Sequence, residues 1–211
     1  QLQLATWRPG RYQLMNYAKN IRFFKAFDKS GTQLICKKIS KDCWEIETTP
    51  NSHIYFQYEY YAFEMDAGNS FFDENQLYVN FINCIPALVG RENEAIQITL
   101  DIPSNYKIAC GLEEIEEHLL VADNYAELID SPMFASSSLQ EKTYAIGNTM
   151  FHIWVQGKYE ADWNKIINDF KKFSIENINL FGDFPYSDYH FLIQILPYRY
   201  YHGVEHRNST V

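Results

Sequence analysis

The sequence predicts a mainly β fold with a C-terminal α/β portion, and three observations carry this prediction. Aromatic residues make up 17% of the 211 residues, with 16 Tyr and 15 Phe, and such residues are enriched in strands. Up to about residue 155, short stretches with a hydrophobic period of two alternate with turn residues; at Asp162 the period changes to three and four. We therefore expect an antiparallel β-sandwich or saddle domain over residues 1–157, followed by the beginning of a second domain over residues 158–211.

Turn residues divide the first part of the chain into short strands. Turns are expected at Pro9-Gly10, where Gly supplies a positive φ, at residues 28–31, and at Pro50-Asn51-Ser52. They separate strands expected before Trp7 and over residues 21–27, 32–39 and 43–48.

The next strand, over residues 53–63, alternates cleanly. One face carries Ile54, Phe56, Tyr58 and Tyr60, and the other carries Tyr55, Gln57, Glu59 and Tyr61. Because the second face is amphipathic, we expect it to meet another layer of the fold and not open water.

Later strands follow a loop at residues 66–70. They are expected within residues 71–81, 96–102 and 151–155. His152 lies on the face opposite its apolar neighbours, and we interpret it as a packed or surface residue and not a ligand. The acidic stretch at residues 113–118 is interpreted as a solvated face in preference to a metal cluster.

One amphipathic helix opens the second part. Its recurring face is formed by Trp163, Ile166, Ile167, Phe170, Phe173, Asn177 or Ile178, and Phe181. Asp162 is a suitable N-cap, and Gly182 ends the helix at the C′ position. A strand is expected at residues 190–196. The change of pattern places a domain boundary near residue 158.

Charge and hydropathy exclude several partners. The formal net charge is −9 and the pI is about 5.1, so no basic field is available to hold a phosphate backbone, and we expect no nucleic-acid partner. No stretch approaches 18 uninterrupted apolar residues, so we expect no membrane span. A signal peptide of the parent protein would lie before Gln1. The oligomeric state stays open.

The four cysteines show no metal-binding spacing. They are Cys36, Cys43, Cys84 and Cys110, and we expect buried free thiols. A bridge between Cys36 and Cys43 stays open as an alternative, which would need an oxidising compartment. We expect a cytoplasmic location in preference to a periplasmic or secreted one.

The segment His202-Gly203-Val204-Glu205-His206 matches the pattern HxxEH, in which two histidines one helical turn apart bind zinc. That pattern requires a helix. Pro197, the tyrosines that follow it and Gly203 favour extended structure instead. In a strand, His202 and His206 would lie about 13 Å apart, too far to share one ion. The zinc interpretation depends on whether residues 201–206 are helical.

Several motifs, in their order and spacing, resemble one family through essentially the whole chain. They are Trp7-Arg8-Pro9-Gly10-Arg11-Tyr12 with Ala18-Lys19-Asn20, Asp73-Glu74-Asn75-Gln76-Leu77-Tyr78-Val79-Asn80, Phe151-His152-Ile153-Trp154, Asp169-Phe170 and Tyr201-His202-Gly203-Val204-Glu205-His206. The family that they resemble is the glycyl aminopeptidase family of zinc metallopeptidases. The resemblance implies an N-terminal β-domain and the first helix and strand of a thermolysin-like catalytic domain.

The resemblance also implies a substrate-binding role for the C-terminal segment. Related aminopeptidases carry a GxMEN strand whose Glu holds the free α-amino group of the substrate, while the strand edge pairs with the peptide backbone. Gly203, Val204, Glu205 and His206 look like this family's version of that strand, with Glu205 as the amine-binding residue. A carboxylate is the simplest partner for a terminal ammonium. His206 stands where Asn would stand, which leaves its role open.

None of the six histidines is followed by Glu, so the zinc motif HExxH is absent from these 211 residues. The resemblance places zinc, its ligands and the general base further along the parent protein. We therefore expect no catalytic residue, no metal ligand and no peptidase activity in this chain alone. The parent is expected to remove N-terminal Gly or Ala from peptides with a free N-terminus.

A second hypothesis is a non-enzymatic β-sandwich module that binds carbohydrate or peptide on its aromatic residues. The abundance of Tyr and Phe permits it, although aromatic residues on strands more often form core and cross-strand pairs. Ligand binding by the isolated chain, with no activity gained on extension past Val211, would favour this hypothesis.

Overall fold

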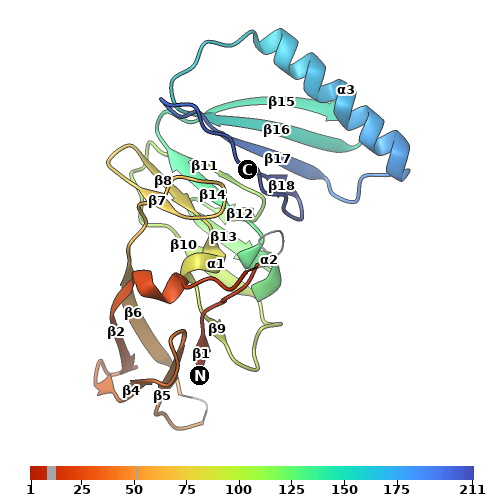
Figure 1. The fold of residues 1–211 in the computed structure, drawn as a ribbon. Helices are drawn as coiled ribbons and strands as arrows, with labels where there is room; N and C mark the ends of the chain where they lie inside the picture. The colour runs from red at the N-terminus through yellow and green to blue at the C-terminus, as the bar shows by residue number, and fades with distance from the viewer. Residues whose placement is uncertain (9–12, 51) are drawn as a thin grey trace.

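The structure is a computed structural model that describes residues 1–8, 13–50 and 52–211 (Figure 1). The turn expected at Pro9-Gly10 lies outside the described residues, as does Asn51 in the turn expected at residues 50–52. Four helical segments are described: η1 (Tyr17–Asn20), α1 (Phe81–Cys84), α2 (Tyr125–Ile129) and α3 (Trp163–Phe181). None of the helices in the described ranges is long and apolar enough to cross a membrane.

The described strands of the first 136 residues form four antiparallel sheets. The first has the order β4 (Cys36–Lys38), β5 (Cys43–Ile46), β1 (Leu2–Gln3), β9 (Ala87–Leu88), and the second β3 (Gln33–Leu34), β2 (Ile21–Asp28), β6 (Ile54–Tyr60). The third has the order β11 (Lys107–Cys110), β14 (Met133–Ser136), β8 (Gln76–Val79), β7 (Phe71–Phe72), and the fourth β10 (Ile96–Thr99), β13 (Leu119–Ala122), β12 (Glu113–Glu116). The predicted antiparallel β region is confirmed.

The last sheet contains parallel pairs. Its order is β15 (Gln140–Ile146), β16 (Thr149–Gln156), β17 (Asp188–Gln194), β18 (Ser209–Thr210). Strands β15 and β16 form an antiparallel hairpin, whereas β17 runs parallel to both β16 and β18. A parallel neighbour needs a crossover connection, and α3 lies in the connection between β16 and β17. The predicted C-terminal α/β portion is confirmed.

The predicted domain boundary at 157/158 falls inside this sheet. Strand β16 lies before the boundary and β17 after it, and the two strands pair along seven residues. The division into residues 1–157 and 158–211 stays a prediction.

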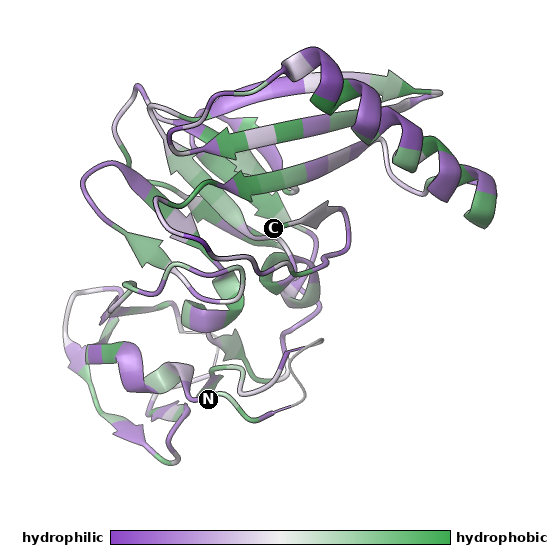
Figure 2. Cartoon of the chain, turned by 45° about the horizontal axis from the view of Figure 1, so that its top comes forward, coloured by the Kyte–Doolittle hydropathy of each residue, from purple (hydrophilic) through white to green (hydrophobic). Residues whose placement is uncertain are grey.

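Helix α3 is capped at both ends as expected. The Asp162 side chain accepts a hydrogen bond from the backbone N–H of Lys165 at 3.1 Å, and Gly182 adopts the left-handed conformation with φ of 89°. Its apolar face packs on the last sheet through Trp163, Ile166, Ile167, Phe170 and Ile178. Phe181 was expected on that face, but it is 77% exposed and borders a cavity between the helix and the sheet. Figure 2 shows hydrophobic residues alternating with polar ones along this helix.

The hairpin turn at residues 28–31 is confirmed, and two other strand predictions need correction. Gly31 donates to the Asp28 carbonyl and has φ of 85°. The single strand expected over residues 32–39 is divided between two sheets, as β3 and β4. The run 71–81 is likewise divided, because the Asp73 side chain accepts from the N–H groups of Asn75 and Gln76 and turns β7 back into β8.

Strand β6 has the predicted alternation, but the expectation for its second face is wrong. Tyr55 is 58% exposed and Tyr61 is 66% exposed, so this face meets no other layer in the described structure. On the opposite face, Phe56 and Tyr58 stack with Phe24 of β2 at ring-centroid distances of 5.9 and 5.5 Å. The amphipathic aromatics on the second face are therefore solvent-facing.

Two of the apolar cores show how the two parts of the chain are joined. One is enclosed within the N-terminal sheets and includes Leu120, Leu128 and Met133. The other joins the third sheet to the last one through Tyr78 and Phe134 on one side and Trp154 and Leu192 on the other. The last sheet is thus packed between the N-terminal region and α3 (Figure 1).

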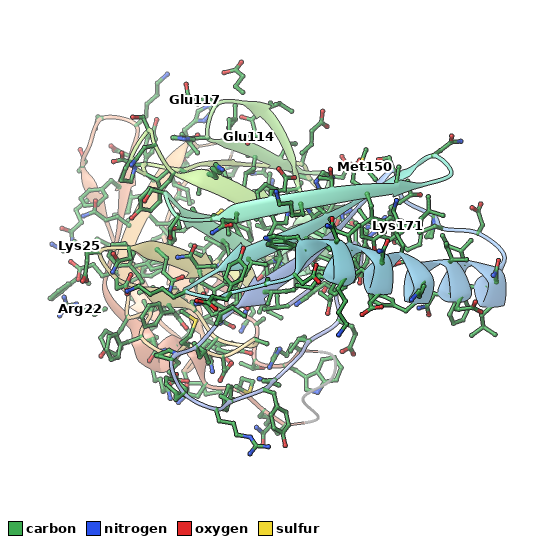
Figure 3. All side chains as sticks on the ribbon, turned by 90° about the horizontal axis from the view of Figure 1, so that it is seen from above. Arg22, Lys25, Glu114, Glu117, Met150 and Lys171 are labelled. Carbon is green, nitrogen blue, oxygen red and sulfur yellow. The ribbon has the colours of Figure 1, made fainter. Side chains whose placement is uncertain are left out.

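The acidic stretch lies on the surface as expected, and of the four cysteines Cys43 and Cys110 are buried as expected, whereas Cys36 and Cys84 are only partly buried. Residues 113–117 are exposed, and Glu114 and Glu117 extend from the periphery of the molecule (Figure 3). All four cysteines are free thiols, and burial raises the pKa of Cys84 and Cys110 to about 12. Cys36 and Cys43 lie on neighbouring strands but form no bridge.

Candidate substrate-binding edge

Residues 204–211 form a short hairpin at the free side of the last sheet. Val204 and Val211 exchange two backbone hydrogen bonds of 3.1 and 3.0 Å, and the His206 N–H donates to the Ser209 carbonyl at 2.9 Å. Glu205 faces Thr210 in an isolated antiparallel bridge between these pairs. Because β18 pairs with β17 on its other side, residues 204–206 form the outermost strand of this sheet in the described structure.

The backbone of Glu205 points away from the hairpin. In an antiparallel ladder, hydrogen-bonded pairs alternate with pairs whose N–H and C=O groups face outward. The pairs at 204/211 and 206/209 are hydrogen-bonded, so the N–H and C=O of Glu205 face the free edge. The Glu205 side chain is exposed, whereas Val204 is buried. This edge therefore offers one donor, one acceptor and one carboxylate at a single residue.

Asp130 anchors the hairpin to the N-terminal region. It is the C-cap residue of α2, and its carboxylate oxygens contact His206 Nδ1 at 2.9 Å and the Arg207 N–H at 3.1 Å. A third link joins the Asn208 side-chain amide to the Gly111 carbonyl at 2.8 Å. The position of Glu205 thus depends on contacts made by its neighbours in the turn.

The four predicted substrate-binding residues have different surroundings. Glu205 faces solvent at the strand edge, Val204 packs inward, and the His206 side chain is only 7% exposed. At Gly203 an added Cβ would lie 3.6 Å from the Val211 carbonyl oxygen, which is an ordinary contact. No steric demand for glycine is visible at this position. The assignment of substrate binding to these residues stays a prediction.

The HxxEH zinc interpretation is wrong. Residues 201–206 contain no helix; they are extended or irregular apart from the bridge at Glu205. His202 Nδ1 lies 3.9 Å from Asp66, whereas His206 contacts Asp130, so the two rings pair with different carboxylates. Among the described residues, no group of three or more His, Cys, Asp or Glu side chains could hold a metal ion.

A cavity of about 220 Å³ lies between this hairpin and the N-terminal region. Its wall is formed by Arg8, Asn80, Ile82, Ala126, Ile129, Asp130, Val204, Glu205 and His206. Arg8 is only 7% exposed. Sequence reasoning noted Arg8 only within a motif and missed Asp130 altogether. No local pattern signals Asp130, because its partner His206 is 76 positions away.

A second polar cluster lies on the last sheet. The His152 ring contacts Glu141 through Nδ1 at 2.7 Å and Asp188 through Nε2 at 3.1 Å, and it stacks on His190 at 4.6 Å. Trp154 Nε1 donates to His190 Nδ1 at 3.1 Å. Burial, and then the neighbouring His152, lower the pKa of His190 to about 4. His152 is a packed strand residue, as expected, and it links three adjacent strands.

The family comparison assigns the N-terminal region. A family model described as the Peptidase M61 N-terminal domain matches residues 1–137. These residues include all four antiparallel sheets, so the fold is that of the N-terminal domain of a peptidase. The chain belongs to the M61 peptidase family. A search of curated proteins found no match.

Solved structures extend the likeness to the last sheet. The chain is similar to an aminopeptidase N family protein from Idiomarina loihiensis, with 27% identity, a TM-score of 0.92, and coverage of 99% of this chain and 36% of that one. It also resembles in fold a variant of a two-domain M1 zinc metallopeptidase bound to L-arginine, with 11% identity, a TM-score of 0.50, and coverage of 90% of this chain and 49% of that one. The chain therefore spans between about a third and a half of these structures.

Proposed function

We propose that this chain is the substrate-recognition part of a zinc-dependent aminopeptidase that removes Gly or Ala from the N-terminus of peptides. Membership of the M61 family and the likeness to an aminopeptidase N family protein support the reaction class. In this proposal, Glu205 binds the α-ammonium group of the substrate. A cytoplasmic location is part of the proposal and can be checked by fractionating cells that express the protein.

The observation that carries the proposal is the free edge at Glu205. An exopeptidase must hold a peptide end in a fixed position and distinguish it from the middle of a chain. The outward N–H and C=O of Glu205 can pair with an extended peptide backbone, as an added strand does. Its carboxylate can form a charge-assisted hydrogen bond with the terminal ammonium. Both contacts come from one residue, so they fix the distance between the substrate amine and its backbone.

Zinc does not fit the described residues of this chain, which contain no cluster of three ligands. We place the metal and the group that activates water elsewhere in the parent protein. The work of these 211 residues is binding and orientation. Asp130 contributes by holding the turn beside Glu205, so that the carboxylate is positioned before the substrate arrives.

The first test replaces Glu205 in the full parent protein. Glu205→Gln should lower kcat/KM for a glycine or alanine p-nitroanilide by about 10- to 100-fold, because a charge-assisted bond is exchanged for a neutral one. Zinc content should stay the same. Glu117→Gln, at an exposed position, is the matched control and should leave kcat/KM unchanged. Loss of zinc in the Glu205 variant would contradict an amine-binding role.

The second test compares chain lengths. The 211-residue chain alone should hydrolyse neither the glycine nor the alanine p-nitroanilide and should show no stoichiometric zinc by metal analysis. The parent protein should hydrolyse these substrates and contain zinc. The alternative of a non-enzymatic module binding carbohydrate or peptide predicts a different result. A parent protein that binds glycans or peptides without cleaving any N-terminal residue would favour that alternative.

A further inference from the structure

The cavity between the Glu205 hairpin and the N-terminal region is lined by Arg8, whose guanidinium has no charge partner among the described residues. Arg8 is 93% buried, and its Nε has no hydrogen-bond partner in the described part of the chain. The carboxylates at this end of the molecule are engaged elsewhere, since Asp66 pairs with His202 and Asp130 with His206. A buried charge without a partner is strongly destabilising unless something else neutralises it.

The position of Arg8 is defined by a close packing contact. A Cβ added at Gly68 would lie 1.9 Å from Arg8 Nη2 and 2.5 Å from its Cζ, so the guanidinium lies directly against the Gly68 backbone. The Gly68 carbonyl is itself held by the Asn83 side chain at 3.2 Å. The charge is therefore packed against an ordered loop within the wall of the cavity, and not on a free side chain in solvent.

A second polar atom in the same wall also lacks a partner. His206 Nδ1 contacts the Asp130 carboxylate at 2.9 Å, where the carboxylate oxygen is the acceptor, but its Nε2 is buried and has no hydrogen-bond partner among the described residues. Buried polar atoms are normally hydrogen-bonded, so each exception needs an explanation. Arg8 and His206 both line one cavity of about 220 Å³. Their unpartnered Nε and Nε2 atoms are fully buried, so an occupant of the cavity would meet the remaining atoms of these two side chains.

Charge and size restrict that occupant. The wall combines the Arg8 cation and the Glu205 anion with the apolar side chains of Ile82, Ile129 and Val204. An occupant that complements it carries both an amine and a carboxylate. The volume is below the roughly 300–1,000 Å³ of pockets for drug-sized ligands, which suits one amino-acid residue. A guanidinium binds carboxylates through its fork of parallel N–H donors.

We propose that this cavity binds a carboxylate carried by an N-terminal residue whose amine is held by Glu205, with Arg8 as the carboxylate-binding side chain. The proposal rests on the proposed function in one respect, the role of Glu205. Two sources supply the same chemistry. One is an acidic side chain on the first residue of a substrate, which would extend the proposed specificity beyond Gly and Ala. The other is the α-carboxylate of a free amino acid such as the released product.

Two ligand pairs distinguish these sources. Aspartic acid α-amide and asparagine α-amide differ only in the side-chain carboxylate, and glycine and glycinamide differ only in the α-carboxylate. Each is titrated into the 211-residue chain, and Kd is measured by NMR chemical-shift changes. At least one carboxylate ligand should bind about tenfold or more tightly than its neutral counterpart. The pair that shows the preference identifies the source.

Variants assign the preference to Arg8. Arg8→Met should abolish the preference for the carboxylate ligand over its neutral counterpart. The urea unfolding midpoint should stay equal or become higher, because an unpaired buried charge is removed. Arg8→Lys should retain part of the preference, since the charge remains but the fork is lost. Arg91→Met, at an exposed arginine that pairs with Glu94, is the matched control and should retain it fully. If Arg8→Met does not fold, the reduced ligand preference of Arg8→Lys is the result that tests the role of Arg8.

The outcomes separate this inference from the proposed function. Glu205→Gln should weaken the binding of both ligands of a pair equally and leave the ratio of their Kd values unchanged. If the wild-type chain prefers neither carboxylate ligand, the cavity binds no carboxylate and the inference is overturned. If the preference persists in a folded Arg8 variant that lacks the charge, another group binds the carboxylate and the inference is also overturned. If the preference is lost with Arg8 but Glu205→Gln changes nothing, the carboxylate site stands and the amine-binding role of Glu205 fails.

Discussion

The N-terminal region and the last sheet reach stability in different ways. The N-terminal sheets enclose their own core, in which Leu128 and Met133 are fully buried, and buried amides tie the loops together. Asn80, for example, donates to the carbonyls of Ala67 and Asn69 at 3.1 and 2.8 Å. The last sheet is instead covered on one face by the N-terminal region and on the other face by α3.

The cover on the second face of that sheet is incomplete. A cavity of about 340 Å³ remains between the C-terminal half of α3 and strands β16 and β17. Leu180 and Phe181, at the end of the helix, are 76% and 77% exposed. The last sheet thus depends on the N-terminal region for the packing of one face, whereas the N-terminal sheets also enclose a core of their own.

The largest effect is expected where the two regions share a core. Phe134→Ala removes a ring that is 1% exposed and packs on Tyr78 at 4.5 Å, so it should lower the free energy of unfolding by about 3–5 kcal/mol. Urea denaturation followed by circular dichroism measures the change. Phe181→Ala is the control and should change it by less than about 0.5 kcal/mol. Similar losses from both variants would contradict the asymmetry described above.

Acid should weaken the last sheet selectively through His190. Its pKa falls from 6.5 to about 4 on folding, so the unfolded chain takes up a proton first. The stabilisation is complete above pH 6.5 and is lost as the pH falls towards 4, by up to about 3 kcal/mol. His190→Gln keeps an acceptor for Trp154 and should flatten this pH dependence. The urea midpoint between pH 7 and 4, read by tryptophan fluorescence, tests it; an unchanged slope would refute the role of His190.

The joint between the regions at Asp130 should have an intermediate effect. Asp130→Ala removes the contacts to His206 and to the Arg207 N–H, and we expect a loss of about 1–2 kcal/mol because the carboxylate is 43% exposed. Hydrogen exchange should accelerate at residues 204–211 more than in β16 and β17. Asp101→Ala, at an exposed position, should alter neither quantity. Uniform acceleration across the sheet would show that the contact is not a local anchor.

The smallest effect is expected at the start of α3. Asp162→Ala removes the N-cap hydrogen bond to Lys165 and should cost about 1 kcal/mol in the free energy of unfolding. Asp162→Asn keeps an acceptor at the cap and should recover most of this loss. If the alanine variant is as stable as the wild type, packing on the sheet alone holds the first turn of the helix.

Local patterns predicted the elements better than their arrangement. The helix was predictable with both of its caps because its period, Asp162 and Gly182 are all contiguous in the sequence. The strands of the antiparallel region were predictable from their alternation. Their division among four sheets in the described structure was not, because pairing partners such as Leu2 and Leu88 lie far apart in the chain. The open face of β6 was misjudged because amphipathic tyrosines occur in buried and exposed settings alike.

For the candidate site, too, the local motif was predictable from the sequence and the long-range surroundings were not. Glu205 was selected from its motif, and the structure adds the free strand edge on which the residue stands. The surroundings of that edge come from distant segments: Arg8 from the N-terminus and Asp130 from the end of α2. Neither carries a sequence signal for a cavity that only the folded chain creates.

The free edge at residues 204–206 also bears on self-association. Unpaired strand edges are templates on which a second chain can add a strand, and proteins protect them with charge and with short length. Here the open strand is three residues long, and the backbone N–H and C=O groups that face outward from it are those of Glu205. Two copies that met edge to edge would bring their Glu205 carboxylates together and repel each other. The negative charge that suits a terminal ammonium thus also opposes aggregation through this edge.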